Sequence, residues 1–293
     1  MSSAVVSTPA AQGRPFVFAI EDVAEVCPPP SGEELFTKGR PPQRVVSATS
    51  AGAFSDAKLA GVIPASRLAV CPAPEMASSG ITAMDALTGG LPRGCLTEIC
   101  GPASSGRTTL LLAALAAATR RGESCAVVDA SDVLDPQSAA AAGVELNRLL
   151  WVRCAEDSPP RRLEQLLRAA DLLLESGGFG LIVLDLGDLP PQTARHIPLT
   201  TWFRFRRAVE HTSTVLLAIE RQSIAGSCSS LLIKLGSQRH WTKQSVDSQF
   251  QAPTHAQLLI ELEITAEMVR SRLDRKPVRS AEITFASQTA WAG

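Results

Sequence analysis

The chain has 293 residues, of which 45% are hydrophobic, and its formal net charge is −1 at pH 7. This length and apolar content suffice for one large domain with a buried core, and the near-zero charge excludes bulk electrostatic attraction to nucleic acid or an anionic membrane. The longest apolar run, residues 110–118, is well short of the roughly 20 residues that cross a bilayer. The seven cysteines form no CxxC pair, so we expect a cytoplasmic protein with reduced thiols and no membrane contact.

Residues 1–60 are rich in Ala, Ser, Pro and Gly and show no sustained hydrophobic period. We expect a largely disordered or linker-like segment that contains a short apolar strand at residues 16–20 and a short helix starting near Ser31. The regular part of the sequence follows, and we assign residues 61–293 to one core domain.

From residue 95 onward, short apolar runs alternate with helical patterns. The apolar runs predict buried strands, at residues 95–100, 124–131, 179–188 and 213–219. Segments with helical spacing lie between them, at residues 108–122, 161–178 and 200–211. This order is typical of an α/β fold, a mostly parallel sheet flanked by helices, whose ligands bind at the carboxyl ends of the strands. The tail differs, because residues 257–265 and 280–287 alternate apolar and polar side chains and predict an antiparallel hairpin.

The stretch GPASSGRTT, residues 101–109, has the glycine spacing of a phosphate-binding loop and lies between a predicted strand and a predicted helix. Its glycines let backbone N–H groups surround phosphate oxygens, and the helix N-terminus adds the positive end of its dipole. The predicted nucleotide-binding residues of the loop are Gly101, Ser104, Ser105, Gly106, Arg107, Thr108 and Thr109. Thr108 and Asp185, which ends a buried strand, are the predicted ligands of a Mg²⁺ ion bound with ATP. A plain turn followed by a helix would use the same residue types without any ligand.

Three segments carry a resemblance to a known family: GGLPRGCLTEICGPASSGRTTL at residues 89–110, SCAVVDASDVLDPQSAAAAGVELNRLLW at 124–151 and FGLIVLDLGD at 179–188. They resemble the ATPase core of bacterial RecA, without large gaps from about residue 81 to about residue 219. The resemblance implies a RecA-like P-loop NTPase core that binds ATP and Mg²⁺, with Asp135 among its nucleotide-binding residues. It also implies self-association into a filament on single-stranded DNA.

The departures from this family fall on catalytic positions. Arg107 stands where the loop has lysine, and its planar guanidinium replaces a compact ammonium where phosphate oxygens converge. Ser131 occupies the position of the glutamate that activates the attacking water, and a serine hydroxyl is no general base at neutral pH. Asp132 would replace that glutamate only if the backbone slipped by one residue. Ser138 stands in place of the tyrosine that stacks on adenine. Arg221, on the direct count, stands in place of the glutamine that senses the γ-phosphate, and Gln222 follows one residue later.

The two loops that bind DNA in this family, which correspond to residues 186–200 and 221–230, are shortened or have lost their glycines. Together with the altered catalytic positions, this resembles ImuA, a RecA-like accessory of translesion synthesis that works beside ImuB, a Y-family polymerase homologue. We therefore expect a component of the DNA damage (SOS) response with no confident catalytic residue, which binds single-stranded DNA, a RecA filament or an ImuB-like partner. Two alternatives stay open: an active, divergent recombinase with DNA-dependent ATPase activity, and a polymer that binds ATP without turnover.

Two basic and aromatic stretches are candidate contacts for DNA or a partner protein. Such mixtures neutralise phosphates and stack on bases. The candidate residues are Arg204, Arg206 and Arg207 in the first stretch and Arg239, Trp241 and Lys243 in the second. For the first stretch the alternative is a helix whose aromatic side chains lie in the core and whose arginines face solvent.

Overall fold

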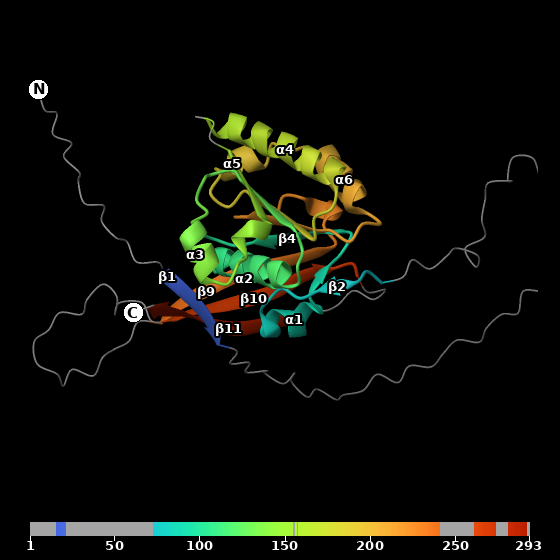
Figure 1. The fold of residues 1–293 in the computed structure, drawn as a ribbon. Coiled ribbons are helices and arrows are strands. Elements are labelled where there is room, and N and C mark those ends of the chain that lie inside the picture. The colour runs from blue at the N-terminus through green and yellow to red at the C-terminus, as the bar shows by residue number, and fades with distance from the viewer. Residues whose placement is uncertain are drawn as a thin grey trace, which may run out of the picture. The chain divides into compact units, whose positions relative to one another are not determined.

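The computed structural model describes residues 16–21, 73–154, 156, 158–240, 261–273 and 281–291. The described residues other than Ala73 belong to one compact unit of the chain, here called the first unit. The helices and strands given below all belong to the first unit (Figure 1). The helix expected near Ser31 lies outside the described residues.

Nine strands of the described chain form one sheet, in the order β1-β11-β10-β9-β4-β8-β7-β5-β6. Their bounds are Phe16–Glu21 (β1), Cys95–Cys100 (β4), Cys125–Asp129 (β5), Leu149–Arg153 (β6), Leu181–Asp185 (β7), Val215–Glu220 (β8), Leu231–His240 (β9), Glu261–Ser271 (β10) and Ala281–Trp291 (β11). Two further short strands, β2 (Met76–Ala77) and β3 (Leu91–Pro92), pair with each other.

The sheet has a parallel half and an antiparallel half. Strands β6, β5, β7, β8, β4 and β9 run parallel to their neighbours, whereas β9, β10, β11 and β1 pair antiparallel. β5 and β8 are buried along their whole length, as expected for strands covered on both faces. The predicted fold class is therefore confirmed, including the antiparallel hairpin near the end of the chain.

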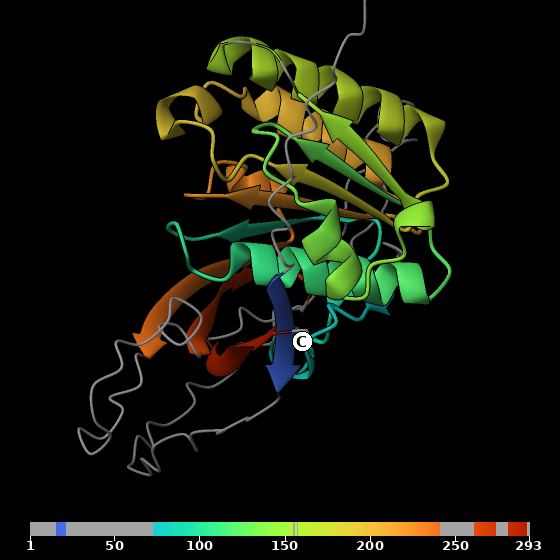
Figure 2. The same ribbon diagram turned by 60° about the vertical axis from the view of Figure 1, so that its left-hand side comes forward.

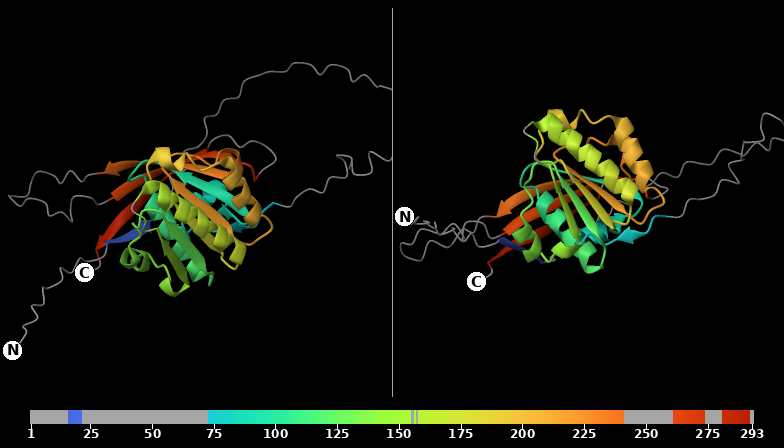
Figure 3. Two further views of the ribbon diagram at one scale, coloured as in Figure 1. Left: turned by 90° about the horizontal axis from the view of Figure 1, so that it is seen from above. Right: turned by 45° about the horizontal axis from the view of Figure 1, so that its top comes forward.

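Helices cover both faces of the parallel half (Figures 1 and 2). The helix bounds are Thr82–Thr88 (α1), Arg107–Arg120 (α2), Pro136–Ala141 (α3), Pro159–Ser176 (α4), Pro191–Ala194 (α5) and Leu199–Val209 (α6), with short 3₁₀ turns at Leu146–Arg148 (η3) and Gly226–Cys228 (η4). α2 packs on one face, where ten of its residues are buried. α4 and α6 lie side by side on the other face (Figure 3). Each face thus has its own apolar core, with the strands between them.

Local sequence explains where the two long helices begin and end. α2 starts after Gly106 and is followed by Gly122, which has a positive φ of 82° and so closes the helix without strain. α4 starts with two prolines and is followed by Gly177, in keeping with the preference for proline in the first turn and glycine after the last. Both helices agree closely with the predicted ranges 108–122 and 161–178.

Three strands differ from the sequence-based expectation. β6 was not predicted, because it is a short strand at the edge of the sheet and is only partly buried. β9 (Leu231–His240) was not predicted either. Residues 235–240 carry little strand signal, and the strand pairs with β10 over almost its whole length. The strand expected at residues 16–20 is present as β1, and it pairs with β11 rather than lying in a linker.

Candidate phosphate-binding site

The loop of residues 101–106 joins β4 to α2 at the carboxyl end of the parallel strands. Gly106 has φ of 92° and Ser104 has φ of 60°, so the chain makes two left-handed steps before the helix begins. A Cβ atom on Gly106 would lie 2.8 Å from Cγ1 of Ile264 on β10. The strand-turn-helix context that a phosphate-binding loop requires is therefore present, and the antiparallel half of the sheet packs against it.

The side chains of the loop point in different directions. Ser105 is fully buried, and its Oγ has no hydrogen-bond partner among the described residues. Thr109 is buried in the first turn of α2, whereas Thr108 is exposed. The Ser104 carbonyl accepts a hydrogen bond from Oγ of Ser237, at 2.6 Å. The loop thus offers one unpaired hydroxyl at its inside and one exposed hydroxyl at its surface.

Arg107 is the first residue of α2, and its side chain reaches the turn that follows β7. Nη1 donates a hydrogen bond of 2.9 Å to the carbonyl oxygen of Gly187, and Nη2 lies 3.9 Å from Oδ1 of Asp188. Only 10% of the Arg107 side chain is exposed. The cation at the position of the usual lysine therefore already binds the protein's own backbone.

Arg221 reaches the same turn from the end of β8. Its Nε donates a hydrogen bond of 3.0 Å to the Gly187 carbonyl, and its Nη2 lies 3.7 Å from Oδ1 of Asp188. Arg107 and Arg221 thus share one carbonyl acceptor and one carboxylate. A Cβ atom on Gly187 would lie 2.5 Å from Nη1 of Arg107, so a larger residue there would displace this guanidinium.

Asp185 ends β7, as predicted, beside this pair of arginines. Its Oδ1 accepts a hydrogen bond of 2.9 Å from the backbone N–H of Gly187. Burial raises the pKa of the Asp185 carboxyl to about 6 and the charge of Asp129 acts in the same direction, while the Gly187 N–H and the Arg107 charge act in the opposite direction. The predicted Mg²⁺ ligand therefore already has a cation and a backbone donor beside it.

Ser131 lies in the turn after β5, and the carboxylates near it are engaged in other contacts. Asp129 accepts hydrogen bonds from the backbone N–H groups of Ser131, Val133 and Leu134, at 2.8–3.0 Å. Asp132 is held by Arg153 in a two-point contact, with Nε–Oδ1 2.6 Å and Nη2–Oδ2 2.5 Å. The acid that follows Ser131 in the sequence is thus bound to β6.

Asp135 precedes α3 and acts as its N-terminal cap. Its carboxylate accepts hydrogen bonds from the backbone N–H groups of Gln137 and Ser138, at 3.3 and 2.9 Å, and from the Ser138 hydroxyl, at 2.5 Å. The hydrogen bond from that hydroxyl is the main reason why the pKa of Asp135 is lowered. Both the predicted nucleotide ligand and the residue at the tyrosine position therefore take part in one cap.

The short loop after β8 is fixed by Glu98, a fully buried residue of β4. Oε1 of Glu98 accepts hydrogen bonds from the backbone N–H groups of Ile224 and Ala225, at 2.6 and 2.8 Å. Oε2 accepts one from Oγ of Ser229, at 2.8 Å, and lies 3.5 Å from Nη2 of Arg270. These contacts determine where the segment that carries Arg221 leaves the sheet.

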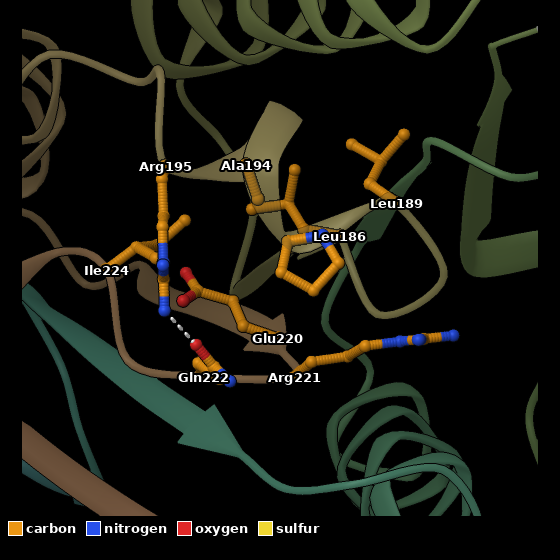
Figure 4. Close-up of a pocket in the computed structure, with 9 residues that line it drawn as sticks. Leu186, Leu189, Ala194, Arg195, Glu220, Arg221, Gln222 and Ile224 are labelled. Carbon is orange, nitrogen blue, oxygen red and sulfur yellow. Dashed lines mark hydrogen bonds between the residues drawn. The ribbon is translucent and has the colours of Figure 1, made fainter.

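A cavity lies next to this segment, between the turn after β7 and the loop after β8 (Figure 4). Most of its wall is apolar, and the carboxyl group of Glu220 points into it. Neither oxygen of Glu220 has a hydrogen-bond partner within the described ranges. Burial, and then the neighbouring Glu98 carboxyl, raise the pKa of Glu220 well above its usual value. Arg195 donates a hydrogen bond to Oε1 of Gln222 beside the cavity, while Arg221 points away from it.

Several of these residues were not predicted from the sequence. Gly187, Asp188 and Glu220 follow or end buried strands, which is the position where ligands of parallel sheets bind. Their position at the ends of buried strands was therefore the sequence signal that could have identified them. The arginine partners of Gly187 and Asp188 come from distant parts of the chain, so no local pattern pointed to them.

Only some of the candidate contacts for DNA or a partner protein lie within the described residues. Trp202 and Phe205 are fully buried, which supports the alternative that aromatic side chains of α6 belong to the core, whereas Phe203 is 49% exposed. Arg204 forms a two-point ion pair with Asp171 of α4, at 2.8 and 3.0 Å. Of the remaining candidates, Arg206 is half-buried and Arg207 is exposed. Arg239 lies near the end of β9, and Trp241 and Lys243 lie outside the described residues.

No group of three or more His, Cys, Asp or Glu side chains in the described part of the chain is placed to hold a metal ion. No helix in the described ranges has the length and apolar character needed to cross a membrane.

Similarity to known proteins is concentrated in the part of the chain that contains this site. Residues 69–194 match the RecA N-terminal domain. The chain is 50% identical over 97 residues to RecA of Ectopseudomonas oleovorans, which covers 33% of this chain and 26% of that protein. It is 44% identical over 113 residues to RecA of Acinetobacter baylyi, covering 38% of this chain and 31% of that protein. The chain therefore matches less than a third of the length of these relatives.

Among solved structures, a crystal structure of the RadB recombinase aligns with 71% of this chain and 94% of its own chain, at 17% identity and a TM-score of 0.48. The sequence matches are the stronger result. They relate the segment with the phosphate-binding loop, Arg107 and Asp185 to RecA.

Proposed function

We propose that this chain is a RecA-like protein of the DNA damage response that binds a nucleotide or acts as a scaffold in the cytoplasm, and that it hydrolyses ATP poorly or not at all. The similarity of residues 69–194 to the RecA N-terminal domain supports the family. The altered catalytic positions support the loss of hydrolysis. An accessory role in translesion synthesis, like that of ImuA, is the specific form of this proposal.

The observation that carries the proposal is the absence of a free carboxylate at the described turn around Ser131. Hydrolysis of ATP requires a base, or a group that orients the attacking water, next to the γ-phosphate. Asp132, the nearest acid in sequence, is bound at two points by Arg153. Asp129 is buried and accepts three backbone hydrogen bonds. Loss of a positioned base typically lowers a rate by about 10²- to 10⁴-fold.

The proposed ligand is ATP, held by residues 101–109. The unpaired hydroxyl of Ser105 and the left-handed steps at Ser104 and Gly106 fit a loop that surrounds phosphate oxygens. The N-terminus of α2, a helix of 14 residues, adds its dipole. Binding of ATP without hydrolysis would shift the chain between two conformations only as far as ATP binds one of them more tightly.

The proposed partners are single-stranded DNA or a RecA filament, together with a Y-family polymerase homologue of the ImuB type. Self-association is part of the same proposal. Arg206 and Arg207 on α6 are the arginines of the described candidate patch that have no described ion pair to a carboxylate and are therefore the first residues to test for DNA contact.

Phosphate release by the purified chain, with and without single-stranded DNA, tests the loss of hydrolysis. We expect no DNA-stimulated release, and we expect a fluorescent ATP analogue to bind under the same conditions. The double variant Arg107→Lys, Ser131→Glu restores the usual lysine and a carboxylate, so measurable turnover by this variant alone would support the proposal strongly. Turnover by the natural chain that disappears in Asp185→Ala would refute it.

An active, divergent recombinase is the second candidate. The observation that favours it is the identity of 50% over 97 residues to a RecA protein. DNA strand exchange that depends on ATP hydrolysis by the natural chain distinguishes this candidate from the first.

A further inference from the structure

We propose that Arg107 and Arg221 form a two-arginine anion site that binds the end of a phosphate chain without Mg²⁺, and that Asp188 occupies this site in the absence of a ligand. The inference rests on the proposed nucleotide binding at the same loop. It concerns how the phosphates are held, and it replaces the Mg²⁺ ion predicted at Thr108 and Asp185 by two side chains of the protein.

The two guanidinium groups lie next to each other. Both donate to the carbonyl oxygen of Gly187, at 2.9 and 3.0 Å, although Arg107 comes from α2 and Arg221 from the end of β8. Two like charges that share one acceptor repel each other, and an anion beside them reduces this repulsion. A guanidinium group carries several N–H donors, so each arginine has further N–H groups available for a second acceptor.

Two carboxylates lie beside the pair: Asp185, which accepts the Gly187 N–H, and Asp188, which is held weakly. Oδ1 of Asp188 lies 3.9 Å from Arg107 and 3.7 Å from Arg221, beyond hydrogen-bond distance in both cases. The Asp188 side chain is 45% exposed and the Arg221 side chain 41% exposed. A half-exposed carboxylate at these distances is easily displaced by an anion with more oxygens and more charge.

A second feature points to a phosphate chain as the ligand. Ser105, between the two loop glycines, is fully buried, and its hydroxyl has no partner within the described residues. A buried polar group normally has a hydrogen-bond partner, so an unpaired one at a binding loop indicates an absent acceptor. The loop N–H groups, this hydroxyl and two guanidinium groups together offer hydrogen-bond donors, which suits consecutive phosphate groups.

The surroundings of Asp185 suit a metal ion poorly. A Cβ atom on Gly187 would lie 2.5 Å from Nη1 of Arg107 and 3.0 Å from Oδ1 of Asp185, so the guanidinium and the carboxylate both lie against this glycine. Oδ1 of Asp185 already accepts the Gly187 N–H. A divalent cation would have to share this carboxylate with a fixed arginine, and the two cations would repel each other.

Calorimetric titration of the full chain with inorganic tripolyphosphate and with ATP, each in excess EDTA and in Mg²⁺, tests the inference. We expect both ligands to bind in EDTA, with dissociation constants within about threefold of those in Mg²⁺ or tighter. Binding that requires Mg²⁺, or no binding of tripolyphosphate at all, would overturn it.

Two variants locate the site. Arg221→Gln removes one charged donor and should weaken tripolyphosphate binding in EDTA by about 10-fold or more. Asp188→Asn removes the competing anion and should strengthen it by up to about fivefold. Arg168→Gln, an exposed arginine of α4 paired with Glu164, is the matched control and should leave binding unchanged.

Opposite effects of the two variants cannot arise from misfolding, because a damaged fold does not gain affinity. Unchanged binding in both variants would overturn the inference even if the natural chain binds tripolyphosphate. The proposed function fails in a different assay, since DNA-stimulated ATP turnover would refute it whatever the EDTA titration gives.

Discussion

Replacing Glu220 with glutamine should raise the free energy of unfolding, and by more at neutral pH than at acidic pH. The Glu220 side chain is buried and has no hydrogen-bond partner in the described structure, and burial raises its pKa well above the usual value. In the unfolded chain the same carboxyl titrates near about 4.3. Between these two values the folded protein binds one proton more than the unfolded chain, so its stability falls as the pH rises.

The difference of one bound proton sets how steeply the free energy of unfolding changes with pH. Within that window the free energy of unfolding of the natural protein falls by up to about 1.4 kcal/mol for each pH unit, relative to a variant that stays neutral. The Glu220→Gln variant should therefore match the natural protein near about pH 4 and exceed it progressively above that, up to the folded-state pKa of Glu220.

Urea denaturation of both proteins at several pH values between about 4 and 7 measures this difference. Glu175→Gln, an exposed glutamate of α4, is the control and should give a constant difference. A Glu220→Gln difference that does not change with pH would refute the reasoning, because it would mean that Glu220 is ionised in the folded protein at little cost.

Three further substitutions test the local structure. Gly106→Ala should lower the free energy of unfolding by about 1–2 kcal/mol for its left-handed backbone and by about 1–3 kcal/mol more for the contact with Ile264. Gly143→Ala, at φ of 90° with nothing within 4 Å, should lower it only by the first amount. Equal losses of stability in urea denaturation would exclude an effect of the Ile264 contact. Asp135→Ala should lower stability by about 0.5–2 kcal/mol through loss of the α3 cap, and Asp135→Asn should restore most of it, as thermal unfolding would show. Trp202→Ala should cost about 3–5 kcal/mol because it opens a cavity under α6, and a cost below about 1 kcal/mol by denaturation would place this ring outside the core.

The sequence predicted well what depends on local pattern. Buried strands such as β5 and β8 have continuous apolar runs, and α2 and α4 have clear helix ends, so four of the six parallel strands (β4, β5, β7 and β8) and the loop at residues 101–106 were found. Strands whose stability comes from their neighbours were harder. β6 lies at an edge with only partial burial, and β9, which was also not predicted, depends on its pairing with β10.

The candidate site shows the same limit. The substitution at Arg107 was visible, but the contact of its guanidinium with Gly187 joins residues 80 positions apart. Arg221 was noted only as a replacement, and its place beside Arg107 depends on the sheet order that brings β8 next to β7. The engagement of Asp132 by Arg153 likewise depends on the pairing of β5 with β6.

The pairing of β1 with β11 has a practical consequence for shortened versions of the protein. β1 supplies backbone partners along residues 286–291 of the outermost hairpin strand. A protein that begins after residue 21 would leave the N–H and C=O groups of that strand unpaired, and such an edge readily pairs with another molecule. Removal of this segment would then favour aggregation, even though it lies at the antiparallel end of the sheet, away from the parallel strands.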